Sequence, residues 1–124
     1  MAKVLGVGGV FFKSKDPEKL GSWYAKWLHV PVEPPYGASF PVSALPAQGF
    51  VAWCPFKEST DYFAPSTREF MFNLVVDDLE GALAQVRQGG AEVMPETQDE
   101  EYGRFGWFID PEGNKVELWQ PPAE

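Results

Sequence analysis

The chain has 124 residues, with 10 basic against 18 acidic side chains and a net charge of -8. This charge repels phosphate backbones and anionic bilayer surfaces, so we expect neither nucleic acid nor a membrane as a partner. No apolar run has transmembrane length, no signal-peptide pattern is visible, and the single cysteine, Cys54, excludes an intrachain disulfide. We therefore expect one cytoplasmic domain, residues 1–124, whose 44% hydrophobic and 15% aromatic residues suffice for a core and a lined cavity.

The first half of the chain begins with a predicted strand, Val4–Lys13, which contains three glycines. Asp16 and Pro17 then begin a helix, because Asp is a good cap and Pro fits the first turn. The apolar stripe of this helix is Leu20, Trp23, Tyr24, Trp27 and Leu28. Two further strands, Ala38–Leu45 and Phe50–Cys54, are expected at edge positions, since proline is dense around them.

The second half repeats this order of elements. Glu69–Val76 is a predicted strand, and Asp77 is expected to cap a helix, with Glu80 three residues later as in a capping box. The stripe of the second helix is Leu79, Ala82, Leu83 and Val86. Gly89-Gly90 end that helix, and Ala91–Met94 is a short strand before a final hairpin.

A shift of 61 or 62 residues places Val10–Asp16 over Phe72–Asp78, and one helix over the other. An internal duplication is the economical explanation. The sequence therefore predicts two βαβββ modules, residues 3–56 and 69–120, joined by a connector at 57–68.

The final hairpin places an acidic side chain among aromatic rings. Phe105–Ile109 and Lys115–Trp119 flank the turn residues Asp110-Pro111-Glu112-Gly113-Asn114. If these strands pair in register, Trp107 lies opposite Glu117 and Phe105 opposite Trp119. Val116, Leu118 and Phe108 then point to the other face. A carboxylate in apolar company needs a cation, a metal or a hydrogen-bond donor, or must be protonated. Glu117 is therefore either on the floor of a pocket or on a half-exposed strand face.

Together these residues give the chain a resemblance to the vicinal oxygen chelate superfamily, which includes glyoxalase I, bleomycin- and fosfomycin-resistance proteins and extradiol dioxygenases. The matching segments are Phe11–Pro17 with Trp23-Tyr24, Val75–Leu79, Tyr102–Trp107 and above all Asp110–Leu118. The resemblance implies an α+β fold in which two βαβββ modules form a curved mixed sheet around a cleft. It also makes a homodimer plausible.

The resemblance further implies about four metal ligands, one from the first and one from the last strand of each module. The corresponding positions are Gly9, Met71 (or Phe70), the stretch 51–53 and Glu117. Only Glu117 offers a suitable side chain, and divalent ions need several oxygen or nitrogen donors. We therefore predict no bound metal and no cofactor.

The predicted cleft is mostly aromatic with a few polar groups. Its walls are Phe11, Trp53, Met71, Trp107 and Trp119, and its possible polar anchors are Asn73, Tyr102, Arg104 and Glu117. The aromatic residues could equally belong to the core, and Arg104 could pair with Glu117, with nearby acidic residues or with solvent. In the connector, Tyr62 and Phe63 should pack on another part of the chain as the lip of a pocket.

Three functions fit this pattern. The first is a metal-free protein that binds a small planar or aromatic compound by stacking, with Glu117 favouring a cationic or hydrogen-donating group. The alternative is a lyase or isomerase that uses Glu117 as general acid or base. The third is a module without a ligand, retained for assembly or regulation.

Overall fold

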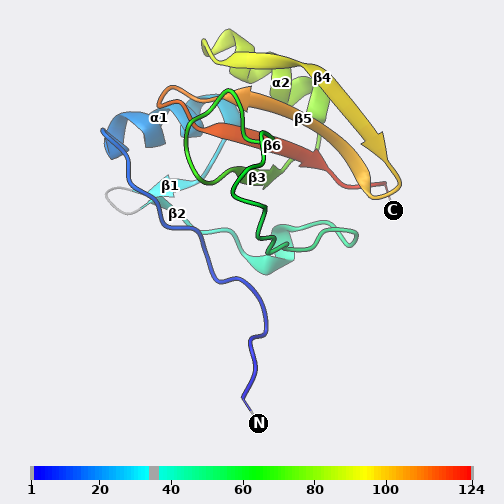
Figure 1. Ribbon diagram of the computed structural model, residues 1–124. Coiled ribbons are helices and arrows are strands. Elements are labelled where there is room, and N and C mark those ends of the chain that lie inside the picture. The colour runs from blue at the N-terminus through cyan, green and yellow to red at the C-terminus, as the bar shows by residue number, and fades with distance from the viewer. Residues whose placement is uncertain (1, 34–36, 124) are drawn as a thin grey trace.

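The computed structural model describes residues 2–33 and 37–123 and has an α+β architecture (Figure 1). Its helices are α1 (Pro17–Leu28) and α2 (Leu79–Gln88), with a short 3-10 helix at Val42–Ala44. Its strands are β1 (Val32–Glu33), β2 (Gly37–Ala38), β3 (Phe72–Val75), β4 (Glu92–Glu100), β5 (Gly103–Ile109) and β6 (Lys115–Gln120). In the described part of the chain neither helix is long and apolar enough to cross a membrane.

The main sheet is built by the second half of the chain alone. Its strand order is β3-β6-β5-β4, with β3 parallel to β6 and the other neighbours antiparallel. The predicted hairpin register is confirmed, since Trp107 lies opposite Glu117 and Phe105 opposite Trp119. The turn between these strands fixes that register, because Gly113 takes a φ of 85° that other residues rarely adopt.

The core lies on one face of this sheet, under both helices. Phe108, Val116 and Leu118 point from β5 and β6 into this core and are fully buried together with Leu79 and Val86 of α2. Trp23 and Tyr24 of α1 pack against the same cluster, with ring centroids 5.9 and 6.4 Å from the Phe108 ring. The apolar stripes of both helices therefore face one shared core, as their helical spacing predicts.

The ends of the two helices confirm one predicted cap and correct the other. The Asp16 side chain accepts a hydrogen bond from the Lys19 amide at the start of α1, as expected. The cap of α2 is Asp78, which accepts from the Gly81 amide, so the prediction of Asp77 is wrong by one residue. Adjacent aspartates present the same capping chemistry, and only the backbone path decides which one is used.

Each helix also donates a side-chain hydrogen bond to a carbonyl group at the C-terminal end of the other. The Trp23 indole of α1 donates to the Gly89 carbonyl after α2 at 2.9 Å, and the Gln85 amide of α2 donates to the Trp27 carbonyl of α1 at 2.7 Å. Carbonyl groups in the last turn of a helix lack partners within the helix. This reciprocal pair of bonds satisfies one such carbonyl on each helix.

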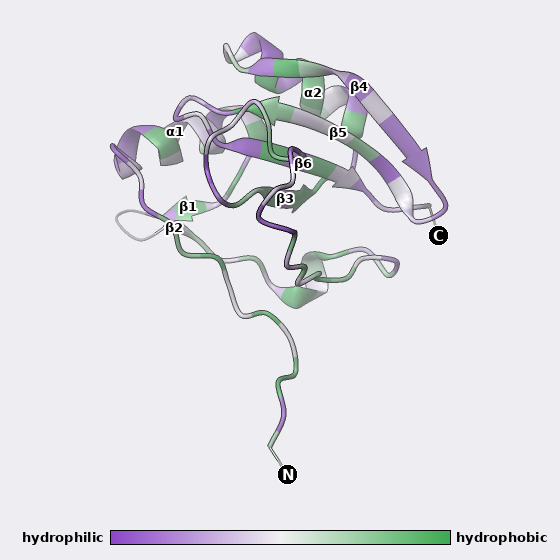
Figure 2. Cartoon of the chain, in the orientation of Figure 1, coloured by the Kyte–Doolittle hydropathy of each residue, from purple (hydrophilic) through white to green (hydrophobic). Residues whose placement is uncertain are grey.

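The strands predicted in the first half are not formed. Val4–Lys13 and Phe50–Cys54 contain no strand, and of Ala38–Leu45 only Ala38 is extended in β2 while Val42–Ala44 form the 3-10 helix. A strand needs a ladder partner as well as suitable residues, and these segments find none within the described chain. The N-terminal segment instead runs away from the sheet, with hydrophobic residues along it (Figure 2).

The DPEGN turn joins the two halves. The buried Asp110 side chain accepts four hydrogen bonds, from the Tyr24 hydroxyl at 2.8 Å, the Glu112 amide and both the amide and the side chain of Asn114. The Tyr24 hydroxyl is itself buried beside this carboxylate, so burial first and the Asp110 charge second raise its pKa. This turn therefore holds α1 onto the sheet.

Glu112 extends the same junction to the residues before α1. Its carboxylate accepts hydrogen bonds from the Ser14 hydroxyl at 2.7 Å and from the amides of Lys15 and Asp16 at 2.9 and 3.1 Å. Partial desolvation acts to raise the pKa of Glu112, but these three bonds and the nearby Arg68 charge outweigh it and lower the pKa. The most recognisable motif of the sequence thus has a structural role.

Candidate functional site

Glu117 lies in the middle of β6, on the face of the sheet opposite the helices. The strand registers place Trp107 of β5 on one side of it and Asn73 of β3 on the other. Side chains directly opposite each other on neighbouring strands point to the same face. A carboxylate, an indole and a carboxamide therefore lie in one row across three strands.

All three neighbours of the carboxylate are hydrogen-bond donors. The Trp107 indole donates to Oε1 of Glu117 at 3.0 Å, and the Asn73 amide donates to Oε2 at 2.6 Å. The third donor is the Tyr62 hydroxyl, which bonds Oε1 at 2.8 Å. Burial raises the pKa of Tyr62, and its hydrogen bond to Glu117 raises it further. The tyrosine therefore keeps its proton and donates it toward the carboxylate.

Tyr62 reaches Glu117 from the connector, which crosses the face of the sheet away from the helices and passes in front of β5 and β6 in Figure 1. The Tyr62 ring meets the Trp107 ring edge-on, at 6.3 Å and 90°, and stacks on Phe56 at 5.6 Å and 17°. The Lys115 ammonium donates to the Tyr62 carbonyl at 2.7 Å and lies 5.3 Å from the Tyr62 ring centroid. One aromatic ring with a hydroxyl donor is thus held between an indole, a phenyl ring and a cation.

A second aromatic group lies further along the same face. Trp119 is 4% exposed, stacks on Phe105 at 6.1 Å with an angle of 3°, and is covered by Phe50 at 4.7 Å. Its indole nitrogen donates to the Tyr102 carbonyl at 2.8 Å. Gly103 makes this contact possible, because a Cβ there would overlap the Trp119 indole nitrogen. Trp119 and Tyr102 therefore lie beside the row formed by Glu117, Trp107 and Asn73. Among the described residues, no hydrogen bond joins either of them to the Glu117 carboxylate.

The structure places the other predicted site residues elsewhere. Arg104 points to the helix face, where it pairs with Glu80 at 2.8 Å and Asp99 at 3.0 Å, so of the partners considered for it a nearby acidic residue is confirmed and Glu117 is wrong. Phe11 and Trp53 are 97% and 79% exposed, and Met71 is half-buried just before β3. The structure therefore brings together Glu117, Asn73 and Trp107 and leaves the predicted aromatic walls from the first half apart.

Two contributors were missing from the predicted site. Lys115 lies two residues before Glu117 on the same strand, so the two-residue period of a strand already placed it on the same face. Tyr62 was predicted to pack on something, but nothing in the connector sequence indicated Glu117 as its partner.

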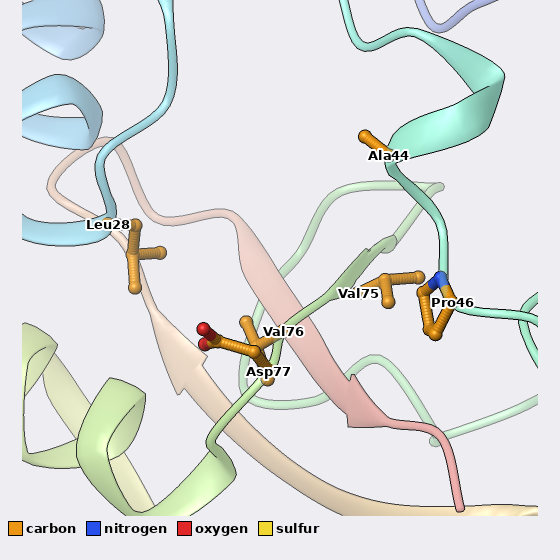
Figure 3. A pocket seen from close by; sticks show the side chains of 6 residues that line it. All are labelled: Leu28, Ala44, Pro46, Val75, Val76 and Asp77. Atoms are coloured by element: carbon orange, nitrogen blue, oxygen red, sulfur yellow. The ribbon is translucent and has the colours of Figure 1, made fainter. Parts of the chain in front are cut away.

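Two hollows in the described structure have linings that do not include Glu117. One of about 280 Å³ is lined by Leu28, Ala44, Pro46, Val75, Val76 and Asp77 (Figure 3). A neighbouring one of about 420 Å³ shares three of these residues and adds His29, Asp78, Ala82 and Gln85. Both lie where α1 ends and α2 begins. At Glu117 the corresponding space is filled by the Tyr62 side chain.

The groups around Glu117 do not fit a metal ion. The described residues contain no group of three or more His, Cys, Asp or Glu side chains that could hold one. The tyrosine, tryptophan and asparagine around the carboxylate direct hydrogen atoms toward it, whereas a cation needs lone pairs directed inward. The donor set therefore suits an anion that is already present, the carboxylate itself.

Comparison with solved structures finds a similar fold in ChaP-H2. The oxidase ChaP-H2 superposes with a TM-score of 0.54 at 19% sequence identity, over 89% of this chain and 88% of that one. TioX from Micromonospora sp. ML1 gives a TM-score of 0.49 at 16% identity, over 90% of this chain and 92% of that one. No curated protein matches the chain.

The fold is that of the vicinal-oxygen-chelate class. The chain itself belongs to the glyoxalase-like domain family, whose model matches residues 9–119.

Proposed function

We propose that the Glu117 face binds a small planar or aromatic compound without a metal or other cofactor. The observation that carries this proposal is Tyr62, whose own ring occupies the site with its hydroxyl 2.8 Å from Glu117 Oε1 and its edge against Trp107. The tyrosine supports this class of ligand, because it is itself a flat ring that carries a hydrogen-bond donor. A ligand of the same kind would replace Tyr62 when the connector moves aside.

The surroundings support the same class of ligand. Trp107 supplies an aromatic ring beside the carboxylate, and Asn73, which donates to Oε2, is exposed. Glu117 supplies the negative charge that would favour a hydroxyl, an amine or another cationic group on the ring. The chain's exposed Cys54 is compatible with a reducing cytoplasm, where we place the protein.

Binding can be measured by the tryptophan fluorescence of the purified chain during titration with phenols, aryl amines and hydroxyquinolines, with cyclohexanol as a saturated control. We expect saturable quenching by aromatic donors and at least about tenfold weaker binding in Glu117→Gln, since a hydrogen bond to a charged group contributes ~1.5–3 kcal/mol. Tyr62→Ala should bind more tightly, because it vacates the site. Arg104→Gln, on the opposite face, is the matched control and should bind like the wild type.

Equal affinity in Glu117→Gln and the wild type would overturn the proposal, as would a library without any saturable aromatic ligand.

A second function, a lyase or isomerase reaction, is favoured by one feature. A ligand that replaces Tyr62 would place its own donor group against Oε1 of Glu117, where the carboxylate could accept and return a proton. Each ligand found above should therefore be tested for turnover. Turnover that is lost in Glu117→Gln while the ligand still binds would establish the enzyme, and binding without turnover would establish the binding protein.

A further inference from the structure

Lys115 places a positive charge on the same face of the sheet as Glu117. The two residues are two positions apart on β6, so their side chains point to the same side and their Cα atoms lie about 7 Å apart. Lys115 is half-buried, and its ammonium group lies 5.3 Å from the centroid of the Tyr62 ring and 5.8 Å from that of the Trp107 ring. The candidate site therefore has a negative end and a positive end, with aromatic rings beside both.

The ammonium group of Lys115 has no carboxylate partner in the described part of the chain. The ion pairs found there are both made by Arg104, on the opposite face of the sheet. The hydrogen bond that Lys115 makes is to a neutral acceptor, the backbone carbonyl of Tyr62 at 2.7 Å. An anionic acceptor in the same position would add Coulomb attraction to this bond, and that attraction is stronger at a half-buried group than in bulk water.

Tyr62 alone satisfies both charged groups. Its hydroxyl donates to Oε1 of Glu117 at 2.8 Å, and its backbone carbonyl accepts from Nζ of Lys115 at 2.7 Å. The covalent path between these two atoms is a phenol ring, a pair of saturated carbon atoms and a carbonyl group, as in a 3-(4-hydroxyphenyl)propanoyl group. The spacing of Glu117 and Lys115 therefore matches a ring with a donor at one end and an acceptor beyond the other.

The groups that make these contacts belong to the sheet and not to the connector. Glu117 and Lys115 are on β6, and Trp107, whose ring meets the Tyr62 ring at 90° and 6.3 Å, is on β5. They stay in place when the connector moves aside. Removal of Tyr62 would then leave a carboxylate, an indole and an ammonium group around the same space.

We infer that the ligand of this site is a phenol or aryl amine whose ring carries a carboxylate on a short chain at the opposite end. The inference rests on the proposed function, because it names the ligand class of the same site. Glu117 accepts from the hydroxyl or amine, and the carboxylate replaces the Tyr62 carbonyl at Lys115. The net charge of -8 does not prevent this, since exposed charges more than about 10 Å away are largely screened at 0.1 M salt.

Tryptophan fluorescence titrations of the full chain with three compounds test this inference. 3-(4-Hydroxyphenyl)propionate has both end groups, 4-propylphenol lacks the carboxylate, and 3-phenylpropionate lacks the hydroxyl. We expect the wild type to bind the first compound at least about tenfold more tightly than either of the others. Saturable binding of 4-propylphenol with equal affinity would overturn this inference and leave the proposed function standing. Without saturable binding of any of the three compounds, both would be refuted.

Lys115→Met shows whether Lys115 is the source of the preference, because methionine keeps an unbranched apolar side chain and removes the charge. The ratio of the affinities for 3-(4-hydroxyphenyl)propionate and 4-propylphenol should fall at least about tenfold. This ratio is the decisive reading, since loss of the bond to the Tyr62 carbonyl also frees the connector and should raise both affinities alike. Lys19→Met, which removes an exposed lysine of α1, is the matched control and should keep the ratio. An unchanged ratio in Lys115→Met would overturn the inference.

If Lys115→Met does not fold, the wild type can be titrated with 3-(4-hydroxyphenyl)propionamide instead. The amide keeps the ring, the hydroxyl, the chain length and the carbonyl oxygen, and it lacks only the negative charge. We expect the amide to bind several-fold more weakly than the carboxylate, because the Coulomb attraction to Lys115 is lost. Equal affinities of the amide and the carboxylate would contradict the inference.

Discussion

Replacing Asp110 with Ala and with Asn should give very different losses of stability, because the four donors around this carboxylate depend on it in different ways. Asp110 is 4% exposed and accepts from the Tyr24 hydroxyl, the Glu112 amide and both nitrogens of Asn114. Asp110→Ala leaves all four donors without a partner. A single hydrogen bond to a charged group contributes ~1.5–3 kcal/mol, and bonds within one network do not add fully.

We expect Asp110→Ala to lower the free energy of unfolding by about 4–5 kcal/mol, which is a large part of the ~5–15 kcal/mol typical of a domain. At this chain length the melting temperature should fall by roughly 15 °C. Asp110→Asn keeps one oxygen for the two backbone amides. Its new nitrogen can donate to Oδ1 of Asn114, which has no partner among the described residues, once that amide rotates. The expected loss is therefore about 1–2 kcal/mol.

Urea unfolding followed by tryptophan fluorescence measures both values, with thermal melting as a second reading. Asp99→Ala is the control, since Asp99 is an exposed carboxylate with a 3.0 Å bond to Arg104 and should change stability by less than about 1 kcal/mol. Equal losses for Asp110→Ala and Asp110→Asn would refute the reasoning about the Asn114 oxygen. A loss below about 1 kcal/mol for Asp110→Ala would refute the role of the network altogether.

Two more predictions concern the turns and the acidic junction. Gly103→Ala should lower the free energy of unfolding by at least about 3 kcal/mol in urea, because φ is 133° and the added Cβ meets Trp119. Gly113→Ala, at φ 85° in open space, should lower it by only about 1 kcal/mol. Similar losses for the two variants would contradict the close approach of Gly103 to Trp119. The folded-state pKa of Glu112 is lowered, so its contribution to stability is present above its usual value of 4.5 and is lost as pH falls below it. Glu112→Gln should therefore flatten the fall in the urea midpoint below about pH 4.5, and an unchanged slope would exclude Glu112 as its source.

The hairpin and the second module were predictable because their determinants are local. The turn after Ile109 sets the register, and alternation along the strands then places Trp107 beside Glu117 and Phe108 in the core. The same alternation puts Arg104 on the helix face, so among its possible partners Glu117 could already have been excluded from the sequence.

The first half could not be predicted in this way. Val4–Lys13 has the composition of a strand, but pairing depends on a partner that the sequence pattern does not identify. The position of Tyr62 could not be predicted for a similar reason. Its contact with Glu117 depends on how the twelve-residue connector, 57–68, crosses a sheet formed by residues far along the chain. The residue pattern of the connector does not indicate that path.

The reciprocal bonds between Trp23 and the Gly89 carbonyl, and between Gln85 and the Trp27 carbonyl, make the two halves of the chain depend on each other. Each half supplies the side chain that satisfies a helix-end carbonyl of the other half, so separating the halves would leave both carbonyls without these partners. Coexpressed fragments cut within the connector should accordingly recover the fold together, while each one alone should not.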